Sequence, residues 1–137
     1  QSIYLLDDTI KNNITLRQEK ENVDYKKLDK VIEFCGLENF LSNTLHGYET
    51  IIGERGVLIS GGEIQRIGIA RALYNDKEIL LFDEFTNQLD GENEEKILQQ
   101  VNKLDKTTIM ISHKLSTLKY CNKLVQIENK KIKELKR

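Results

Sequence analysis

Residues 59–84, ISGGEIQRIGIARALYNDKEILLFDE, decide the fold of this chain. A helix is predicted at about 61–74, because a Ser-x-x-Glu capping pattern precedes an apolar periodic run. The short apolar run at 78–82 is typical of a strand that is buried on both faces. Asp83 and Glu84 follow that run directly. The stretch therefore predicts a helix that leads into a sheet strand with two carboxylates at its carboxyl end.

A second helix and strand follow the two carboxylates. Residues 91–104 predict a helix with acidic residues in its first turn, where the helix dipole favours them, and with one apolar side. Residues 107–112 predict another buried strand. Because strand–helix–strand connections are right-handed and join parallel neighbours, strands 78–82 and 107–112 should lie in one parallel sheet.

The remaining segments divide into a helical part and an α/β part. A glycine follows the apolar periodicity of residues 23–35, as expected one residue past a helix end. The other expected elements are a helix at 37–43, a loop with some extended structure at 48–59, a helix at 115–120 and a hairpin of strands 123–128 and 131–135 turning at Asn129-Lys130. We expect an α/β fold with a helical subdomain at 1–75 and sheet elements at 76–137.

The composition excludes several classes of protein. The 137 residues fit one domain, and 21 basic against 22 acidic residues give a net charge of −1, which predicts no nucleic-acid partner. Cys35 and Cys121 have no metal-ligand spacing and are interpreted as reduced thiols in a cytosolic compartment. No apolar run approaches the roughly 20 residues that span a bilayer, and no signal peptide is visible. The start at Gln1, inside a patterned segment, predicts a piece of a longer protein.

Three polar side chains are expected at one edge of the sheet. Asp83 and Glu84 follow one strand, His113 follows the next, and the carboxyl ends of such strands are where ligands bind. A first carboxylate there can hold Mg²⁺ and a second can accept a proton from an attacking water, although two acids after a strand can equally start a loop. A histidine there can contact a γ-phosphate or orient water, although a lone histidine is more often structural. With only His46 elsewhere, a zinc site is not expected.

The start of the helix at 61 offers an anion site. A capping box explains Ser60 and Glu63, but two glycines in a first turn weaken a helix. Gly61 and Gly62 leave backbone N–H groups bare, and with the serine hydroxyl and the positive helix end these can bind a phosphate. Asp90 is expected to cap the helix at 91–104, which by itself needs no function.

Taken together and in this order, these segments resemble the ATP-binding cassette (ABC) family across essentially the whole chain. The matching segments are 59–66 for the LSGGQxQR signature, 79–84 for the Walker B strand, 87–90 for the SALD D-loop, 111–117 for the switch histidine and Gln1 with 2–10 for the Q-loop. The resemblance implies a partial P-loop NTPase (RecA-like) parallel sheet with an α-helical subdomain.

The resemblance also implies roles for these residues. Glu84 would be the general base, Asp83 the Mg²⁺ partner and His113 the sensor of the γ-phosphate of ATP. Gln1 would contact Mg²⁺ or water and couple to a transmembrane domain. Two cassettes would pair head-to-tail, with ATP between the phosphate loop of one and the signature of the other. The nucleotide contacts implied on this chain are Ser60, Gly61, Gly62, Glu63 and Asp90.

Three segments suggest a subfamily. Residues 50–56, TIIGERG, and residues 8–14 are similar to segments of ABC exporters, and the wording of residues 1–10 is similar to flippases for lipid-linked saccharides. The resemblance therefore implies ATP-driven export, at the cytoplasmic face of the inner or plasma membrane. The alternatives are a soluble ABC ATPase acting on DNA or the ribosome and a non-catalytic interaction module.

The chain departs from the family pattern at several points. No GxxxxGK[ST] phosphate loop and no adenine-stacking aromatic is found, and the family places both upstream of the residue matched by Gln1. We therefore expect this chain alone to be inactive. Glu63 replaces the usual glutamine, and its carboxylate would repel a triphosphate unless it points back as the capping partner. Phe85 replaces alanine, and Asn87-Gln88 replaces Ser-Ala.

Overall fold

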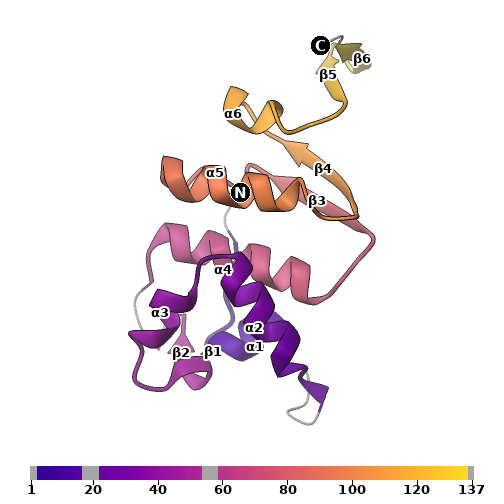
Figure 1. Ribbon diagram of the computed structural model, residues 1–137. Helices are drawn as coiled ribbons and strands as arrows, with labels where there is room; N and C mark the ends of the chain where they lie inside the picture. Colours follow the sequence, from indigo (N-terminus) through magenta and orange to yellow (C-terminus); the bar gives the residue numbers. More distant parts are fainter. Residues whose placement is uncertain (1–2, 17–21, 54–58, 136–137) are drawn as a thin grey trace.

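The computed structural model describes residues 3–16, 22–53 and 59–135. Among these, the helices are α1 (Ile10–Thr15), α2 (Tyr25–Phe34), α3 (Glu38–Ser42), α4 (Gly61–Tyr74), α5 (Gly91–Val101) and α6 (Leu115–Leu118), with a 3-10 turn, η2, at Gly47–Glu49. The strands are β1 (Asp8–Thr9), β2 (Ile51–Ile52), β3 (Ile79–Asp83), β4 (Thr107–Ile111), β5 (Leu124–Glu128) and β6 (Lys131–Leu135). Figure 1 shows the helical elements α1 to α4 at one end and the later strands and helices toward the other.

The helical part is organised around α4. Helices α1 and α2 both pack against it, and β1 pairs antiparallel with β2 beside them. Helix α4 begins at Gly61 after Ser60, as the capping pattern predicts. Helix α2 is two residues shorter at its start than predicted, because Asp24 caps it by accepting from the N–H of Lys27. Gly36 follows its end with φ +62°, a left-handed conformation that glycine adopts without a Cβ clash.

One apolar core joins the helical part to the sheet. It includes Ile67 of α4, Phe82 of β3 and Leu98 of α5, all buried. Phe85 stacks on Phe82 with ring centroids 4.4 Å apart, so the large residue that replaces the family's alanine fills this core. Burying each such side chain contributes about 1.5–3 kcal/mol relative to leaving it exposed.

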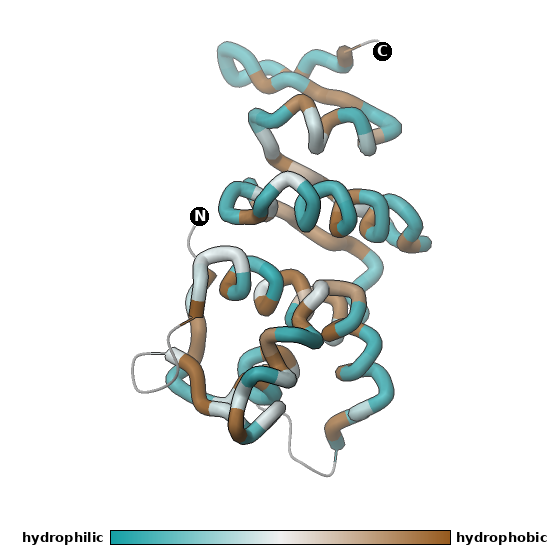
Figure 2. Tube along the Cα trace, turned by 60° about the vertical axis from the view of Figure 1, so that its left-hand side comes forward, coloured by the Kyte–Doolittle hydropathy of each residue, from teal (hydrophilic) through white to brown (hydrophobic). Residues whose placement is uncertain are grey.

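Strands β3 and β4 are parallel neighbours, as predicted. Ile79 lies opposite Thr107 and Asp83 lies opposite Ile111, so the two strands end level with each other. The prediction that both faces are buried is wrong. On β3, Leu80 and Phe82 are buried, whereas Ile79 and Leu81 are 59% and 71% exposed. Figures 1 and 2 show α5 against one face, and no element of the described segments covers the exposed Leu81.

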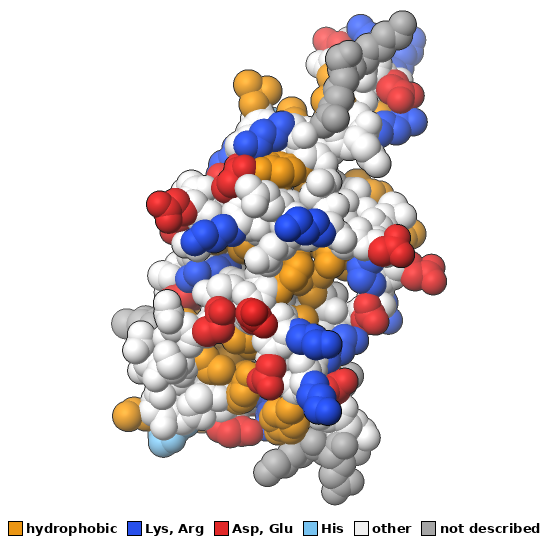
Figure 3. Space-filling model, in the orientation of Figure 1, with side chains coloured by type: hydrophobic (Ala, Val, Ile, Leu, Met, Phe, Trp, Pro, Cys, Tyr) orange, Lys and Arg blue, Asp and Glu red, His pale blue; other side chains and the backbone are white. Residues whose placement is uncertain are grey.

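The last strands form the predicted hairpin. Strands β5 and β6 pair antiparallel, and Asn129 and Lys130 turn the chain with φ of 49° and 61°. The hairpin projects from the end of the molecule in Figure 1, and Figure 3 shows side chains of both charges on it. Helix α6 ends two residues before the predicted position, and α5 ends at Val101, three residues before it. Within the described segments, no helix has the length and apolar character needed to cross a bilayer.

Candidate functional site

Glu84 and His113 lie together at the carboxyl ends of the two parallel strands. The N–H of Glu84 donates to the carbonyl of Ile111 at 2.9 Å, which extends the strand pairing by one step. Nε2 of His113 is 3.5 Å from Oε1 of Glu84, an ion-pair distance when the imidazole is protonated. Asp83 is the exposed last residue of β3. The structure therefore brings Glu84 and His113 together at this edge, and Asp83 ends the strand that leads to Glu84.

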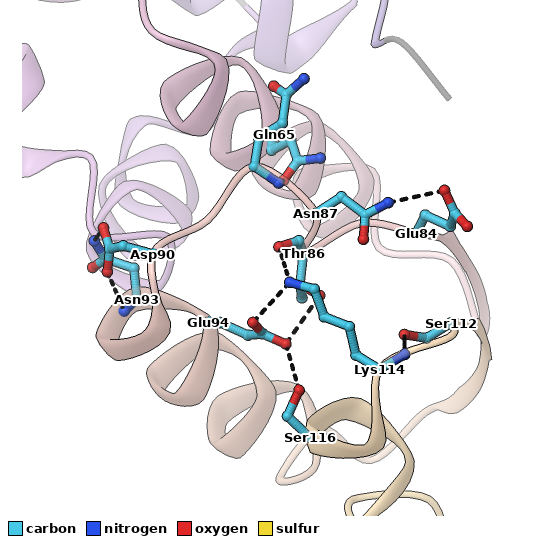
Figure 4. Close-up of polar contacts among 11 residues, drawn as sticks. Gln65, Glu84, Thr86, Asn87, Asp90, Asn93, Glu94, Ser112, Lys114 and Ser116 are labelled. Carbon is cyan, nitrogen blue, oxygen red and sulfur yellow. Dashed lines mark hydrogen bonds and ion pairs between the residues drawn. The ribbon is translucent and has the colours of Figure 1, made fainter.

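The backbone of Glu84 is left-handed, with φ of 47°. This conformation costs a residue with a Cβ about 1–2 kcal/mol, and such strain gathers at functional sites. The side chain of Asn87 donates to Oε2 of Glu84 at 2.9 Å (Figure 4). The carboxylate is therefore flanked by the amide of Asn87 on one oxygen and by the imidazole of His113 near the other.

The start of α4 contains the complete capping box. The Ser60 side chain accepts from the N–H of Glu63 at 3.3 Å, and Oε2 of Glu63 accepts from both the N–H and the hydroxyl of Ser60 at 2.8 Å. The carboxylate of Glu63 is therefore turned back toward the cap. This is the orientation in which it interferes least with an anion in front of the helix.

Gly61 and Gly62 lie against the loop of residues 86–90, which follows Glu84. A Cβ on Gly61 would stand 2.3 Å from Oε1 of Gln88, and one on Gly62 would stand 3.2 Å from the carbonyl oxygen of Gln88. The N–H of Gln88 donates to Oε1 of Gln65, on α4, at 2.9 Å. The sequence analysis explained the two glycines by the close approach of a ligand. The structure adds a second explanation, because a side chain at either position would crowd against the 86–90 loop of the same chain.

Asp90 caps α5. Its carboxylate accepts from the N–H and the side-chain amide of Asn93 at 3.0 and 2.7 Å (Figure 4). The backbone N–H of Asn93 holds the pKa of Asp90 below its usual range. The capping role is confirmed, and contact of Asp90 with nucleotide stays a prediction.

Gln1 lies outside the described residues, as do residues 54–56 of the exporter-like segment 50–56. The chain just after Gln1 crosses α4 at Gly68, where an added Cβ would stand 2.4 Å from Cδ1 of Ile3. A hollow of about 270 Å³ is lined by Ile3, Tyr4 and Asp83, among others. The segment that follows Gln1 therefore lies close to the end of β3.

Sequence reasoning missed two polar networks. Arg71 of α4 donates from Nε to the carbonyl of Asn13 at 2.7 Å and from a terminal nitrogen to the carbonyl of Tyr4 at 3.0 Å. Glu94 of α5 is buried and paired with Lys114. Charged residues on a helix are usually interpreted as a solvent-exposed face, so neither network was predicted. The one sequence signal is that Arg71 interrupts the apolar run 67–73, which indicates a charged side chain that contacts other parts of the chain.

The acidic residues fit a Mg²⁺ ion that is coordinated jointly by the protein and by substrate phosphates better than one coordinated by protein side chains alone. In the segments that the structure describes, no group of three or more His, Cys, Asp or Glu side chains could hold a metal ion. Mg²⁺ is commonly bound through one or two carboxylates together with substrate phosphates and water. Exposed Asp83, at a strand end and lining a hollow, fits that mode.

Comparison with known proteins assigns the family. A family model described as ABC transporter matches residues 2–87. The chain belongs to the ABC transporter family. It is 38% identical over 136 residues to an ATP-dependent lipid A-core flippase of Pectobacterium atrosepticum, covering 98% of this chain and 23% of that protein. It is 41% identical to the alpha-hemolysin translocation ATP-binding protein HlyB of Escherichia coli, covering 98% of this chain and 19% of that protein.

A solved structure extends the match to three dimensions. A bacterial Atm1-family ABC exporter with ATP bound superposes with a TM-score of 0.82 at 35% identity, over 91% of this chain and 22% of that one. The ABC chain described here thus has the α/β fold of part of a P-loop NTPase domain. It spans about a fifth of the length of the relatives it matches.

Proposed function

We propose that the protein containing this ABC chain hydrolyses ATP and uses the energy to export or flip a substrate across a membrane. The observation that carries the proposal is the meeting of Glu84 with His113 at the ends of β3 and β4, 3.5 Å apart. The relatives support it, since their names describe an ATP-dependent flippase and a translocation ATP-binding protein.

Glu84 would act as general base toward the attacking water, and His113 would contact the γ-phosphate or orient that water. Asp83, with Gln1, would hold Mg²⁺, which supplies charge neutralisation for the phosphates when bound. Asn87 would keep the Glu84 carboxylate turned toward the water through its hydrogen bond. Hydrolysis at such a site rests mostly on positioning and electrostatics.

Ser60, Gly61, Gly62, Glu63 and Asp90 would form the face toward a second ABC ATPase domain in a head-to-tail dimer. The position of Gly61 and Gly62 in the first turn of α4 supports this, because a helix N-terminus favours a phosphate. In this proposal, residues 1–75 are the Q-loop and helical subdomain, and residues 76–137 are core. The other partner is a transmembrane domain, and the chain lies at the cytoplasmic face of the membrane.

We also propose that the 137-residue chain does not turn over ATP by itself. It contains the general base but no GxxxxGK[ST] motif, whose backbone and lysine grip the phosphates. The full protein with a second domain would then be the active unit.

The test is Glu84→Gln in the full-length protein. The amide keeps the shape and the bond to Asn87 but cannot take a proton, so turnover should fall by roughly 10²–10⁴-fold while ATP still binds. Steady-state hydrolysis and nucleotide-binding titration measure the two quantities. The matched control is Glu92→Gln, an exposed acid on α5, which should change neither. Unchanged turnover in the Glu84→Gln protein would reject Glu84 as the general base, whereas absence of turnover in the parent protein would favour a non-catalytic module.

A further inference from the structure

A buried carboxylate lies behind the proposed site, on α5. Glu94 is only 8% exposed, and its oxygens accept hydrogen bonds from Lys114 at 2.9 Å, Ser116 at 2.9 Å and Thr86 at 3.2 Å (Figure 4). Burial raises the pKa of Glu94, but the bonds from Lys114 and Ser116 outweigh it and hold the pKa below its usual range. A buried charge of this kind is costly unless paired, so the contacts form a unit.

Lys114 connects two loops through this unit. Its Nζ donates to Oε2 of Glu94 and to the carbonyl of Thr86, both at 2.9 Å. Thr86 is two residues after Glu84, and Lys114 is the residue after His113. The backbone N–H of Lys114 donates to the hydroxyl of Ser112 at 3.0 Å, which fixes the other side of His113. The loop that carries His113 is thereby joined to the loop that leaves Glu84.

His113 needs such support because its own side chain has little packing. The imidazole is 91% exposed, so its position follows from the backbone of residues 112–114. Strand β4 ends at Ile111, two residues earlier, so the sheet does not extend to His113. The contacts that anchor the residues on either side of His113 include the Ser112 hydroxyl and the Lys114 side chain.

We propose that Lys114 and Glu94 are positioning residues, whose ion pair sets the place of His113 relative to Glu84. The inference rests on the proposed function, because it names the contacts that hold Glu84 and His113 at the correct distance from each other for ATP hydrolysis. A displacement of about 1 Å at such a site lowers the rate of the chemical step strongly while leaving nucleotide binding nearly intact.

The first test is Lys114→Met in the full-length protein. Methionine keeps much of the unbranched stem but leaves Glu94 without its cation. We expect kcat for ATP hydrolysis to fall roughly tenfold or more, with KM for ATP within about twofold of the parent. Lys114→Arg keeps the charge and several donors, and should recover most of kcat.

A control exists at the other end of α6, where Lys119 follows the helix as Lys114 precedes it. Lys119 pairs with Glu95 of α5 at 3.0 Å, so Lys119→Met removes a more exposed Lys–Glu ion pair between the same two segments, away from His113. It should leave kcat unchanged. If Lys119→Met lowers kcat as much as Lys114→Met, the effect comes from general loosening of α6 and the proposal is wrong.

A second variant keeps the test decisive if Lys114→Met does not fold. Glu94→Asp retains both charges and shortens the carboxylate by one methylene, so it shifts the pair without abolishing it. We expect kcat to fall several-fold, by about three to ten times, with an unchanged thermal midpoint. Variants that lower the midpoint but keep the parental kcat well below it would show a purely structural role and overturn the proposal.

The parallel Glu84→Gln measurement separates the two proposals. If Glu84→Gln abolishes turnover while Lys114→Met and Glu94→Asp keep the parental kcat, the positioning role fails alone. If Glu84→Gln retains the parental turnover, the general-base role in the proposed function fails, and if the parent itself shows no turnover, the proposed function fails.

Discussion

At the scale of single residues, Glu63 places a negative charge where the ABC signature usually has a neutral glutamine. Its carboxylate is bound back to Ser60, so the capping box is complete without glutamine. A negative charge nevertheless remains in the first turn, beside the N–H groups at which a phosphate would bind. The side chain stabilises the helix and opposes the anion at the same time.

We therefore predict that Glu63→Gln in the full-length protein lowers KM for ATP. Glutamine can still serve in a capping box, and the lost interaction with the helix dipole should cost only about 0.3–1 kcal/mol of stability. Steady-state kinetics and thermal unfolding measure the two effects. Glu92→Gln, in the first turn of α5, is the control for charge removal elsewhere. A KM that rises or stays the same would show that the carboxylate does not act on bound nucleotide.

The meeting of Glu84 with His113 could be predicted, whereas the residues that hold them in place could not. Two apolar strands joined by a helix place their carboxyl ends together whatever else the chain does. The supporting contacts, Lys114–Glu94 and Arg71–Asn13, form only because a segment distant in the sequence covers a charged side chain. A charged residue at a helix position does not indicate whether another segment will cover it. Figure 4 shows the first of these pairs, with Thr86 hydrogen-bonded to Glu94 and with Asn87 and Glu84 along the same loop.

At the scale of elements, α4 holds the N-terminal segment through one side chain. Arg71 donates to the carbonyls of Tyr4 and Asn13 and, at 3.3 Å, to Oδ1 of Asn13. Asn13 is fully buried, and its amide also donates to the carbonyls of Leu6 and Thr9. Helix α1, only six residues long, depends on this tertiary contact, which explains why sequence periodicity did not resolve it. Helix α4 was predicted at both ends because its cap is local.

We predict that Arg71→Met destabilises the helical part by about 1–3 kcal/mol, because it leaves the carbonyl of buried Asn13 without its donor. Denaturant unfolding of the full-length protein's ATPase domain, monitored by circular dichroism, measures this. Arg71→Lys should lose less, since one ammonium can still reach a single carbonyl. Lys96→Met, at an exposed position of α5, is the surface control. Equal stability of Arg71→Met and the parent would mean that α1 does not depend on the Arg71 contacts.

At the scale of the whole molecule, the sheet is covered on one side. The exposed strip runs across both strands, with Leu81 opposite Ile109 in register, and β4 adds the half-exposed Ile111. A run of apolar residues in a strand predicts burial on both faces, but a pattern within the strand carries no information on whether a covering element is present. Contiguous apolar surface of this kind, on strands with unpaired edges, favours association.

We therefore predict that the 137-residue chain, studied alone, self-associates in a concentration-dependent way. Leu81→Thr combined with Ile109→Thr should shift it toward monomer, because threonine keeps the preference for strand while removing apolar area from the strip. Sedimentation velocity over a concentration series measures the association, and circular dichroism checks that the helices persist. Leu45→Thr is the control, since Leu45 is 95% exposed but lies in the loop between α3 and η2, away from the sheet. A parent chain that stays monomeric across the series, or a double variant that associates as strongly as the parent, would show that the strip does not drive association. If the double variant still associates, the unpaired edges of the two strands become the next candidates for the contact.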